Sequence, residues 1–198
     1  MTAQLRASRL MAGLRRRVGG ETTTVGEMLG HLGDRATAFL LLVLAIPALI
    51  PSTGLPIGAM FGAAMSVIAL QMLLGREAVT LPGFIARRSL TAAQVEALVR
   101  RSVPVLRRAE RHLRPRLGGL ARAGRLPALL VLLHGVLIVL PIPLGNTLPG
   151  LAVILIALGL LVRDGAAVAA GLVVSVAAVA FAAVMVGAVV WAGGAVMA

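Results

Sequence analysis

The sequence predicts an all-α integral membrane protein, because its apolar residues form long uncharged blocks that proline and glycine break near the middle. Hydrophobic residues make up 59% of the 198 residues and charged residues only 13%. The mean hydropathy is +0.99. A soluble domain of this length needs more polar residues to cover its surface, so we expect a single membrane domain, residues 1–198.

Residues 1–25 form a basic segment, with arginines from Arg6 to Arg17. Gly, Glu and Thr follow where a signal peptide would place its apolar core, so we expect a cytoplasmic tail. Residues 26–77 hold the first apolar block, which the prolines and glycine between Pro47 and Pro56 divide into two pieces. Each piece is shorter than the ~20 residues that cross a bilayer core. This pattern predicts a re-entrant or short helical hairpin.

Residues 87–125 carry most of the arginines on a segment with helical periodicity. Val95 and Val99 fall near one face, and the arginines fall on the other, so we expect an amphipathic helix at the membrane interface, kinked at Pro104. Because aromatic residues are only 3% of the chain, nucleic acid is not the expected partner. Anionic lipid headgroups fit better, and the residues expected to bind them are Arg100, Arg101, Arg107 and Arg108.

Residues 126–165 repeat the organisation of residues 26–77. When Leu55-Pro56-Ile57-Gly58 is laid on Ile142-Pro143-Leu144-Gly145, Arg76-Glu77 falls on Arg163-Asp164. This match indicates an internal duplication, although two apolar segments can also share a Pro, a Gly and a charge by chance. The excess of arginine predicts that both hairpins enter from the cytoplasmic side, while an inverted repeat of the kind found in transporters remains an alternative.

Residues 166–198 have no charged side chain and end near Trp191, which suits a membrane interface. We expect one long transmembrane helix or a tight pair of helices. Small residues permit close helix contact and could support a homodimer or packing within the monomer; they are Gly171, Ser175, Gly187 and Gly193.

The two breaks are the candidate substrate-binding site, because non-helical backbone at membrane depth must be buried in protein or line a wet cavity. Uncharged polar groups and inward-pointing helix N-termini would favour an anionic ligand. The alternative is that the prolines and glycines only shape short helices. The expected site residues are Pro51, Ser52, Thr53, Gly54, Pro143, Gly145 and Asn146.

Charged residues flank the apolar blocks and are expected to end helices at the interface or to act as a gate. They are Asp34, Arg35, Arg76, Glu77, Arg163 and Asp164. Glu27, His31 and Asp34 share a helical face that could bind a metal, but a solvent-facing role is the default, and we expect no metal or cofactor. Gln71 and His134 are polar residues within the apolar blocks, and such residues are functional candidates if they face the interior. For Gln71 a packing role explains the residue equally well, and His134 is near enough to the start of its block to lie at the interface.

Catalytic motifs are missing from the sequence. There is no cysteine, no glycine-rich phosphate loop followed by lysine, and no nucleophile elbow. We therefore expect that the protein is not an enzyme.

A set of motifs in a fixed order gives the sequence a family resemblance. It resembles the ExoD family between about Thr24 and Val190 through Gly33-Asp34-Arg35, Ile46-Pro47 to Pro51, Gln71-Met72-Leu73-Leu74-Gly75-Arg76, Leu81-Pro82, Arg114-Pro115-Arg116, Leu140-Pro141-Ile142-Pro143-Leu144-Gly145-Asn146, Gly159-Leu160 and Arg163-Asp164-Gly165. The resemblance implies a bacterial inner-membrane protein that supports exopolysaccharide synthesis. One departure is Thr80, where the family commonly has an aromatic residue.

Three functions follow as hypotheses. The first is a small transporter or flippase-like protein for an anionic or lipid-linked species, an organisation that resembles DedA-type proteins with two re-entrant hairpins. The second is a non-transporting membrane adaptor of a polysaccharide synthesis machine, acting through its arginine-rich helix. The third is a proton or ion pathway through Asp34, Asp164 and Glu77.

Overall fold

The computed structural model describes residue 13 and residues 22–49, 57–76, 79–121, 124–140 and 145–197. Inside these ranges, the side chains of residues 57, 101, 102, 105, 106, 109, 112 and 193–197 are not described. The described chain is mostly helical, which confirms the helical class expected from the sequence. A small antiparallel sheet of two three-residue strands, β1 (Thr22–Thr24) and β2 (Ser89–Thr91), was not expected.

Four short apolar helices form two hairpins. The first pairs α3 (Ala36–Ala48) with α4 (Ile57–Leu73), and the second pairs α7 (Arg125–Val139) with α8 (Thr147–Val162). Pro47 does not break α3, which ends one residue later, and Pro149 lies in the first turn of α8, where a missing N–H costs little. The breaks between the helices therefore span fewer residues than the clusters of proline and glycine in the sequence.

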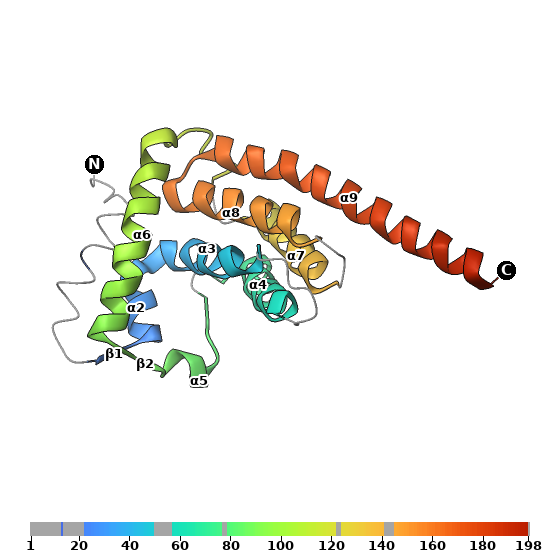
Figure 1. Cartoon of the computed structure of the whole chain (residues 1–198). Helices are drawn as coiled ribbons and strands as arrows, with labels where there is room; N and C mark the ends of the chain where they lie inside the picture. Colours follow the sequence, from blue (N-terminus) through green and yellow to red (C-terminus); the bar gives the residue numbers. More distant parts are fainter. Residues whose placement is uncertain are drawn as a thin grey trace.

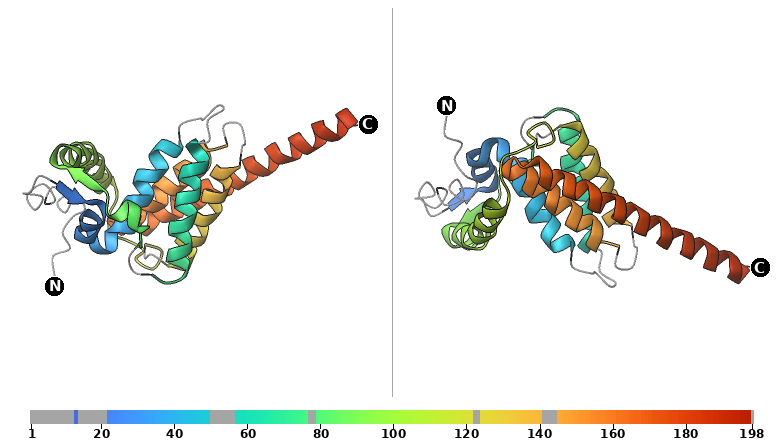
Figure 2. Two further views of the ribbon diagram at one scale, coloured as in Figure 1. Left: turned by 90° about the horizontal axis from the view of Figure 1, so that it is seen from below. Right: turned by 90° about the horizontal axis from the view of Figure 1, so that it is seen from above.

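The hairpins pack so that exchanging one for the other leaves the pattern of contacts unchanged. Helix α4 lies against α7, and α3 lies against α8 (Figures 1 and 2). A Cβ atom on Gly62 would lie 2.6 Å from the carbonyl oxygen of Gly135, so α4 and α7 almost touch there. On the other side, a Cβ atom on Gly150 would lie 3.0 Å from Leu49. Glycine makes both of these approaches possible.

These two contacts also place both breaks at the same end of the four helices. Gly62 is in the first turns of α4 and meets Gly135 in the last turns of α7, while Gly150 at the start of α8 meets Leu49 just after α3. The hairpins thus run in the same sense. An inverted repeat would place the breaks at opposite ends, so the packing of these helices favours two hairpins that run in the same direction.

Residues 165–197 form one continuous helix, α9 (Gly165–Met197), and not a pair of helices. At 1.5 Å per residue α9 is about 50 Å long, roughly twice the length of α8, and it extends well past the hairpins (Figure 1). Gly171 and Ser175 are buried inside the monomer, whereas a Cβ atom on Gly187 would meet nothing within 4 Å. Only the outer part of α9 therefore offers small residues to a partner.

A second layer covers the end of the hairpins opposite the breaks, which we call the base. It contains α2 (Val25–Leu32), the 3-10 turn η1 (Gly33–Arg35), α5 (Gly83–Ala86), the sheet, and α6 (Ala92–His112), which crosses the base (Figure 1). Thr24 and Glu27 form a capping box that starts α2, so Glu27 has a structural partner. Helix α6 runs through Pro104 as one helix.

Two helical stretches among the described residues, Val25–Ala48 and Gly165–Ala192, are long and apolar enough to cross a membrane. Three further apolar helices are shorter, at residues 58–73, 125–139 and 147–162. Val25–Ala48 contains α2, η1 and α3, and Gly165–Ala192 lies within α9, so short apolar helices are confirmed for α4, α7 and α8.

The close contact between α4 and α7 predicts that Gly62→Val destabilises the protein. The added side chain overlaps the backbone of Gly135, and overpacking of this kind costs about 1–3 kcal/mol. Gly187→Val is the matched control, because that position faces open space. Thermal unfolding in detergent should show a lower melting temperature for Gly62→Val alone, and equal values for the two variants would contradict the packing.

Candidate functional site

A cavity of about 340 Å³ lies at the base, where η1, α3, α8 and the segment after α6 meet. Its walls combine charged, polar and apolar side chains. The lining residues are Asp34, Arg35, Thr37, Ala38, Gly118, Ala121, Leu160 and Arg163. Three of the six charged residues expected from the sequence therefore lie in one cavity.

Two arginines determine the electrostatics of this cavity. Arg35 is about half buried, and Arg163 is close enough to repel its charge, an effect that Glu110 and Asp34 partly offset. Arg163 also forms an ion pair with Asp34, with 3.8 Å between nitrogen and oxygen. The Asp34 side chain is 91% exposed, so this ion pair adds little stability. An anion bound between the two guanidiniums would relieve their repulsion.

Asp164 lies next to the cavity and holds the base together. Its carboxylate has no exposure to solvent and accepts hydrogen bonds from the Arg114 N–H at 2.9 Å, the Arg116 Nε–H at 3.1 Å and the Ala166 N–H at 2.9 Å. The bond from Ala166 caps the start of α9. Asp164 therefore joins the segment after α6 to the turn between α8 and α9.

Backbone contacts fix the same turn. Arg163 has a left-handed conformation, with φ of 61°, which ends α8, and the Gly165 N–H donates to the Arg116 carbonyl at 2.7 Å. A Cβ atom on Gly165 would overlap the carbonyl group of Leu117. Only glycine fits at position 165, and the turn consequently presents Arg163 to the cavity.

Three of the family motifs thus meet at the base, although they are far apart in the sequence. Arg114-Pro115-Arg116 supplies donors to Asp164, which belongs to Arg163-Asp164-Gly165, while Arg163 pairs with Asp34 of Gly33-Asp34-Arg35. The sequence showed each charged pair separately. It contained no signal that Arg114 and Arg116 would bind Asp164.

Arg76 is not part of this cavity. Its guanidinium donates to the Thr80 hydroxyl at 2.7 Å, and Gln71 forms three hydrogen bonds with Thr80, so Gln71 shapes the turn after α4. Thr80 therefore has a structural role in the place of the family's aromatic residue. Phe84, four residues later, is 80% exposed on α5. Glu77 lies outside the described residues.

Of the break residues, Gly145 and Asn146 are described, and they lie at the opposite end of the hairpins, about 24 Å from the base by the length of α8. Gly145 and Asn146 are buried, and the Asn146 carbonyl accepts from the Gly150 N–H at 2.9 Å. Pro51, Ser52, Thr53, Gly54 and Pro143 lie outside the described residues. The structure therefore separates the break residues from the charged cavity, which the sequence left open.

His134 lies deeper than expected, fully buried between α7 and α9 and not at the interface. Its Nε2 atom is 2.6 Å from the Ser175 hydroxyl oxygen. The two residues are distant in the sequence, so sequence reasoning had no means of pairing them.

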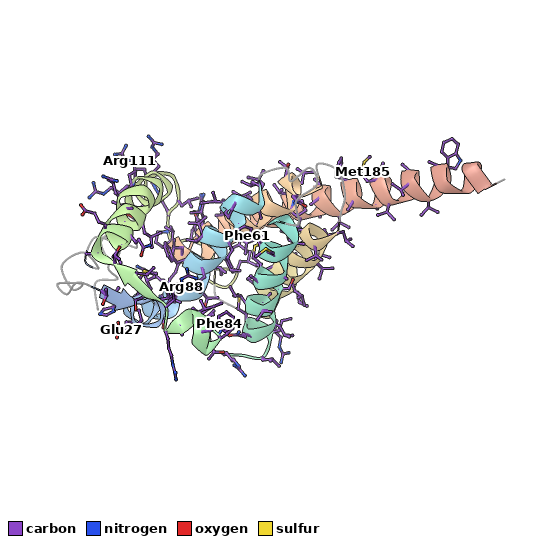
Figure 3. The ribbon with its side chains drawn as sticks, turned by 60° about the horizontal axis from the view of Figure 1, so that its bottom comes forward. Glu27, Phe61, Phe84, Arg88, Arg111 and Met185 are labelled. Carbon is purple, nitrogen blue, oxygen red and sulfur yellow. The ribbon has the colours of Figure 1, made fainter. Side chains whose placement is uncertain are left out.

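On α6 the apolar face is covered by the protein, since Val95 and Val99 are buried. Arg100, Arg107 and Arg108 are exposed, and Arg111 points away from the rest of the molecule (Figure 3). The Arg101 side chain is not described. The outer face of α6 therefore offers charge, not apolar surface, to a partner.

Comparison with known proteins identifies the family. Residues 7–184 match the family described as "Exopolysaccharide synthesis, ExoD". The chain belongs to the ExoD family. It is 33% identical over 175 residues to Protein ExoD of Rhizobium meliloti (strain 1021), covering 85% of this chain and 72% of that protein. It is 26% identical over 156 residues to an uncharacterized protein of Synechocystis, covering 77% of this chain and 74% of that protein.

The ExoD family is involved in exopolysaccharide synthesis, as the sequence resemblance implied. No solved structure matches the chain. The role of this member of the ExoD family must therefore be inferred from its own fold and cavity.

The Asp164 contacts predict that Asp164→Asn destabilises the base. The substitution places an amide NH₂ where one carboxylate oxygen accepts an N–H, and the loss of hydrogen bonds to a buried charged group costs about 2 kcal/mol or more. Asp34→Asn is the control, because that carboxylate is exposed. Unfolding should be easier for Asp164→Asn only, and equal stability of the two variants would contradict the role of Asp164.

The Asp164 carboxyl also predicts that the stability of the fold depends on pH. Burial raises its pKa, but the N–H groups of Arg114 and Ala166 and the Arg116 guanidinium outweigh burial and hold the pKa below the ordinary value of 3.8. A carboxyl with a lowered folded-state pKa stabilises the fold above its unfolded-state pKa and loses this effect as the pH falls. The stability difference between wild type and Asp164→Asn should shrink below about pH 4.

Proposed function

We propose that this ExoD family member is an integral protein of the bacterial inner membrane that binds the anionic headgroup of a lipid-linked species during exopolysaccharide synthesis. The observation that carries the proposal is the base cavity, where Arg35 and Arg163 lie at the ends of apolar helices.

A membrane location is supported by the surface of the helices. Among the described residues, α3, α4, α8 and α9 carry no charged side chain, and α7 carries one, at its first residue, Arg125. Large apolar side chains are exposed in rows along three helices, where lipid would cover them. Examples are Met60, Val67 and Leu70 on α4, Leu129, Leu133 and Val136 on α7, and Val173, Val176 and Val184 on α9.

The depth of the two hairpins supports re-entrant segments. Helices α3, α7 and α8 have 13, 15 and 16 residues, so each is about 20–24 Å long, less than the ~30 Å hydrocarbon core. Each hairpin enters and returns at the base, whereas α9 is long enough to cross completely. The arginines of the base favour the cytoplasm for that end.

The cavity suits a phosphate or a similar anion attached to an apolar chain. Arg35, Arg163 and Thr37 offer N–H and O–H donors, and Ala38 and Leu160 offer apolar contacts in the same walls. A headgroup held there lies level with the charged end of the helices. Its chain would then lie along them in the hydrocarbon. In a transporter or flippase-like role, the bound species would also have to move past the two breaks between the helices of the hairpins.

The proposal predicts that Arg35→Gln and Arg163→Gln each weaken binding of a polyprenyl phosphate by about tenfold or more, roughly 1.4 kcal/mol. Native mass spectrometry of the full chain measures this, with the matching polyprenol, which lacks the phosphate, as the control ligand. Arg87→Gln is the control variant, because Arg87 is exposed outside the cavity. Equal binding of phosphate and alcohol, or equal losses in all three variants, would overturn the proposal.

A second function is favoured by α6, whose outer face presents exposed arginines while its apolar face is buried. This arrangement suits an adaptor that docks on acidic partners of a synthesis machine. Exopolysaccharide output of a deletion strain complemented with variants separates the two functions. A greater loss in the combined Arg100, Arg107 and Arg108 to Gln variant than in Arg35→Gln would favour the adaptor.

A further inference from the structure

His134 is the one ionisable side chain in the interior of the apolar helices, as far as the structure describes them. It is completely buried, and its partner is Ser175 on α9, with 2.6 Å between Nε2 and the hydroxyl oxygen. Ser175 is itself buried, and its hydroxyl donates to the Gly171 carbonyl at 2.8 Å. This chain of hydrogen bonds connects α7 to α9.

The hydrogen bonds determine which nitrogen of His134 carries the proton. A serine hydroxyl has a single hydrogen, and Ser175 uses it for the Gly171 carbonyl. Its oxygen must therefore accept from His134, which places the hydrogen of the neutral imidazole on Nε2. The Nδ1 atom is left with a bare lone pair, and it is buried without a hydrogen-bond partner among the described residues.

Among the described residues, the helices packed on α7 offer no counter-charge to this nitrogen. The helices that pack against α7 are α4, α8 and α9, and none of them carries an ionisable side chain in its described part. Arg125 is at the far end of α7, and the carboxylate of Asp164 is held at the base by three donors. Whatever binds at Nδ1 must be a hydrogen-bond donor or a proton, since the atom can only accept.

We propose that Nδ1 of His134 is a proton-binding site and that a proton bound there changes the packing of α9 on α7. Protonation turns a buried acceptor into a charged donor for which the surroundings provide no acceptor. A charged group without a partner is costly in an apolar interior, so α9 must shift or water must enter. The ligand of this site is the proton, and the inference does not depend on anion binding at the base.

The direct test is the imidazole signal of His134 in labelled full-length protein in nanodiscs. His31→Gln and His112→Gln remove the two other histidines, so one signal remains. The expected result is an Nε2–H tautomer at neutral pH that becomes doubly protonated on acidification while the protein stays folded. A signal that keeps its neutral form until the protein unfolds would overturn the proposal.

The second test asks whether the proton moves α9. His134→Gln keeps an amide N–H for Ser175 but does not titrate in this range, so it is a matched variant. Hydrogen exchange of α9 amides around Ser175, corrected for the intrinsic effect of pH, should rise on acidification in wild type, and this rise should be lost in His134→Gln. The same rise in both proteins would show that His134 is not the proton-binding site. If His134→Gln does not fold, the imidazole signal alone decides.

Discussion

The arrangement of the base depends on one buried carboxylate. The Asp164 carboxylate is shielded from water and accepts hydrogen bonds from Arg114, Arg116 and Ala166 instead. Without these donors, burial of its charge would be strongly unfavourable. Through these bonds the chain that leaves α6 is fixed to the turn between α8 and α9. That turn in turn places Arg163 beside Arg35 and sets the start of α9 against α8. The cavity, the base layer and the position of the long helix therefore share one support.

The sequence was sufficient for the apolar helices and for the arginine-rich helix, but not for the sheet or for the contacts between elements. Clusters of proline and glycine showed where the hairpins turn, and the uncharged residues 166–198 showed the long helix. The apolar helices have no polar face, however, so their patterns could not show that Gly62 meets Gly135. Strand β1 has three threonines and no alternation, which hid the sheet. The sequence showed each charged pair by itself. Only the tertiary structure showed that Arg114 and Arg116 bind Asp164.

The one-sided arrangement bears on the proposed binding of an anionic headgroup at the base. The cavity and the arginine face of α6 belong to the same end, so the positive charge that would attract a phosphate-bearing lipid surrounds the place proposed to bind it. The described residues beside the breaks, Leu49 and Asn146, are at the far end, and His134 is the one ionisable group in the described part of the apolar interior. The proposed anion site and the proposed proton site would thus be separated along the helices.

The most direct test of this account is the accessibility of single cysteines in cells, since the natural chain has none. One cysteine replaces Thr53, between α3 and α4, a second replaces the exposed Thr147 at the start of α8, and a third replaces the exposed Arg107 on α6. The account predicts that positions 53 and 147 behave alike towards a membrane-impermeant thiol reagent added outside the cell, and that position 107 is labelled only after the inner membrane is opened. Labelling of positions 53 and 147 from opposite sides, or of either from the side that labels position 107, would contradict it.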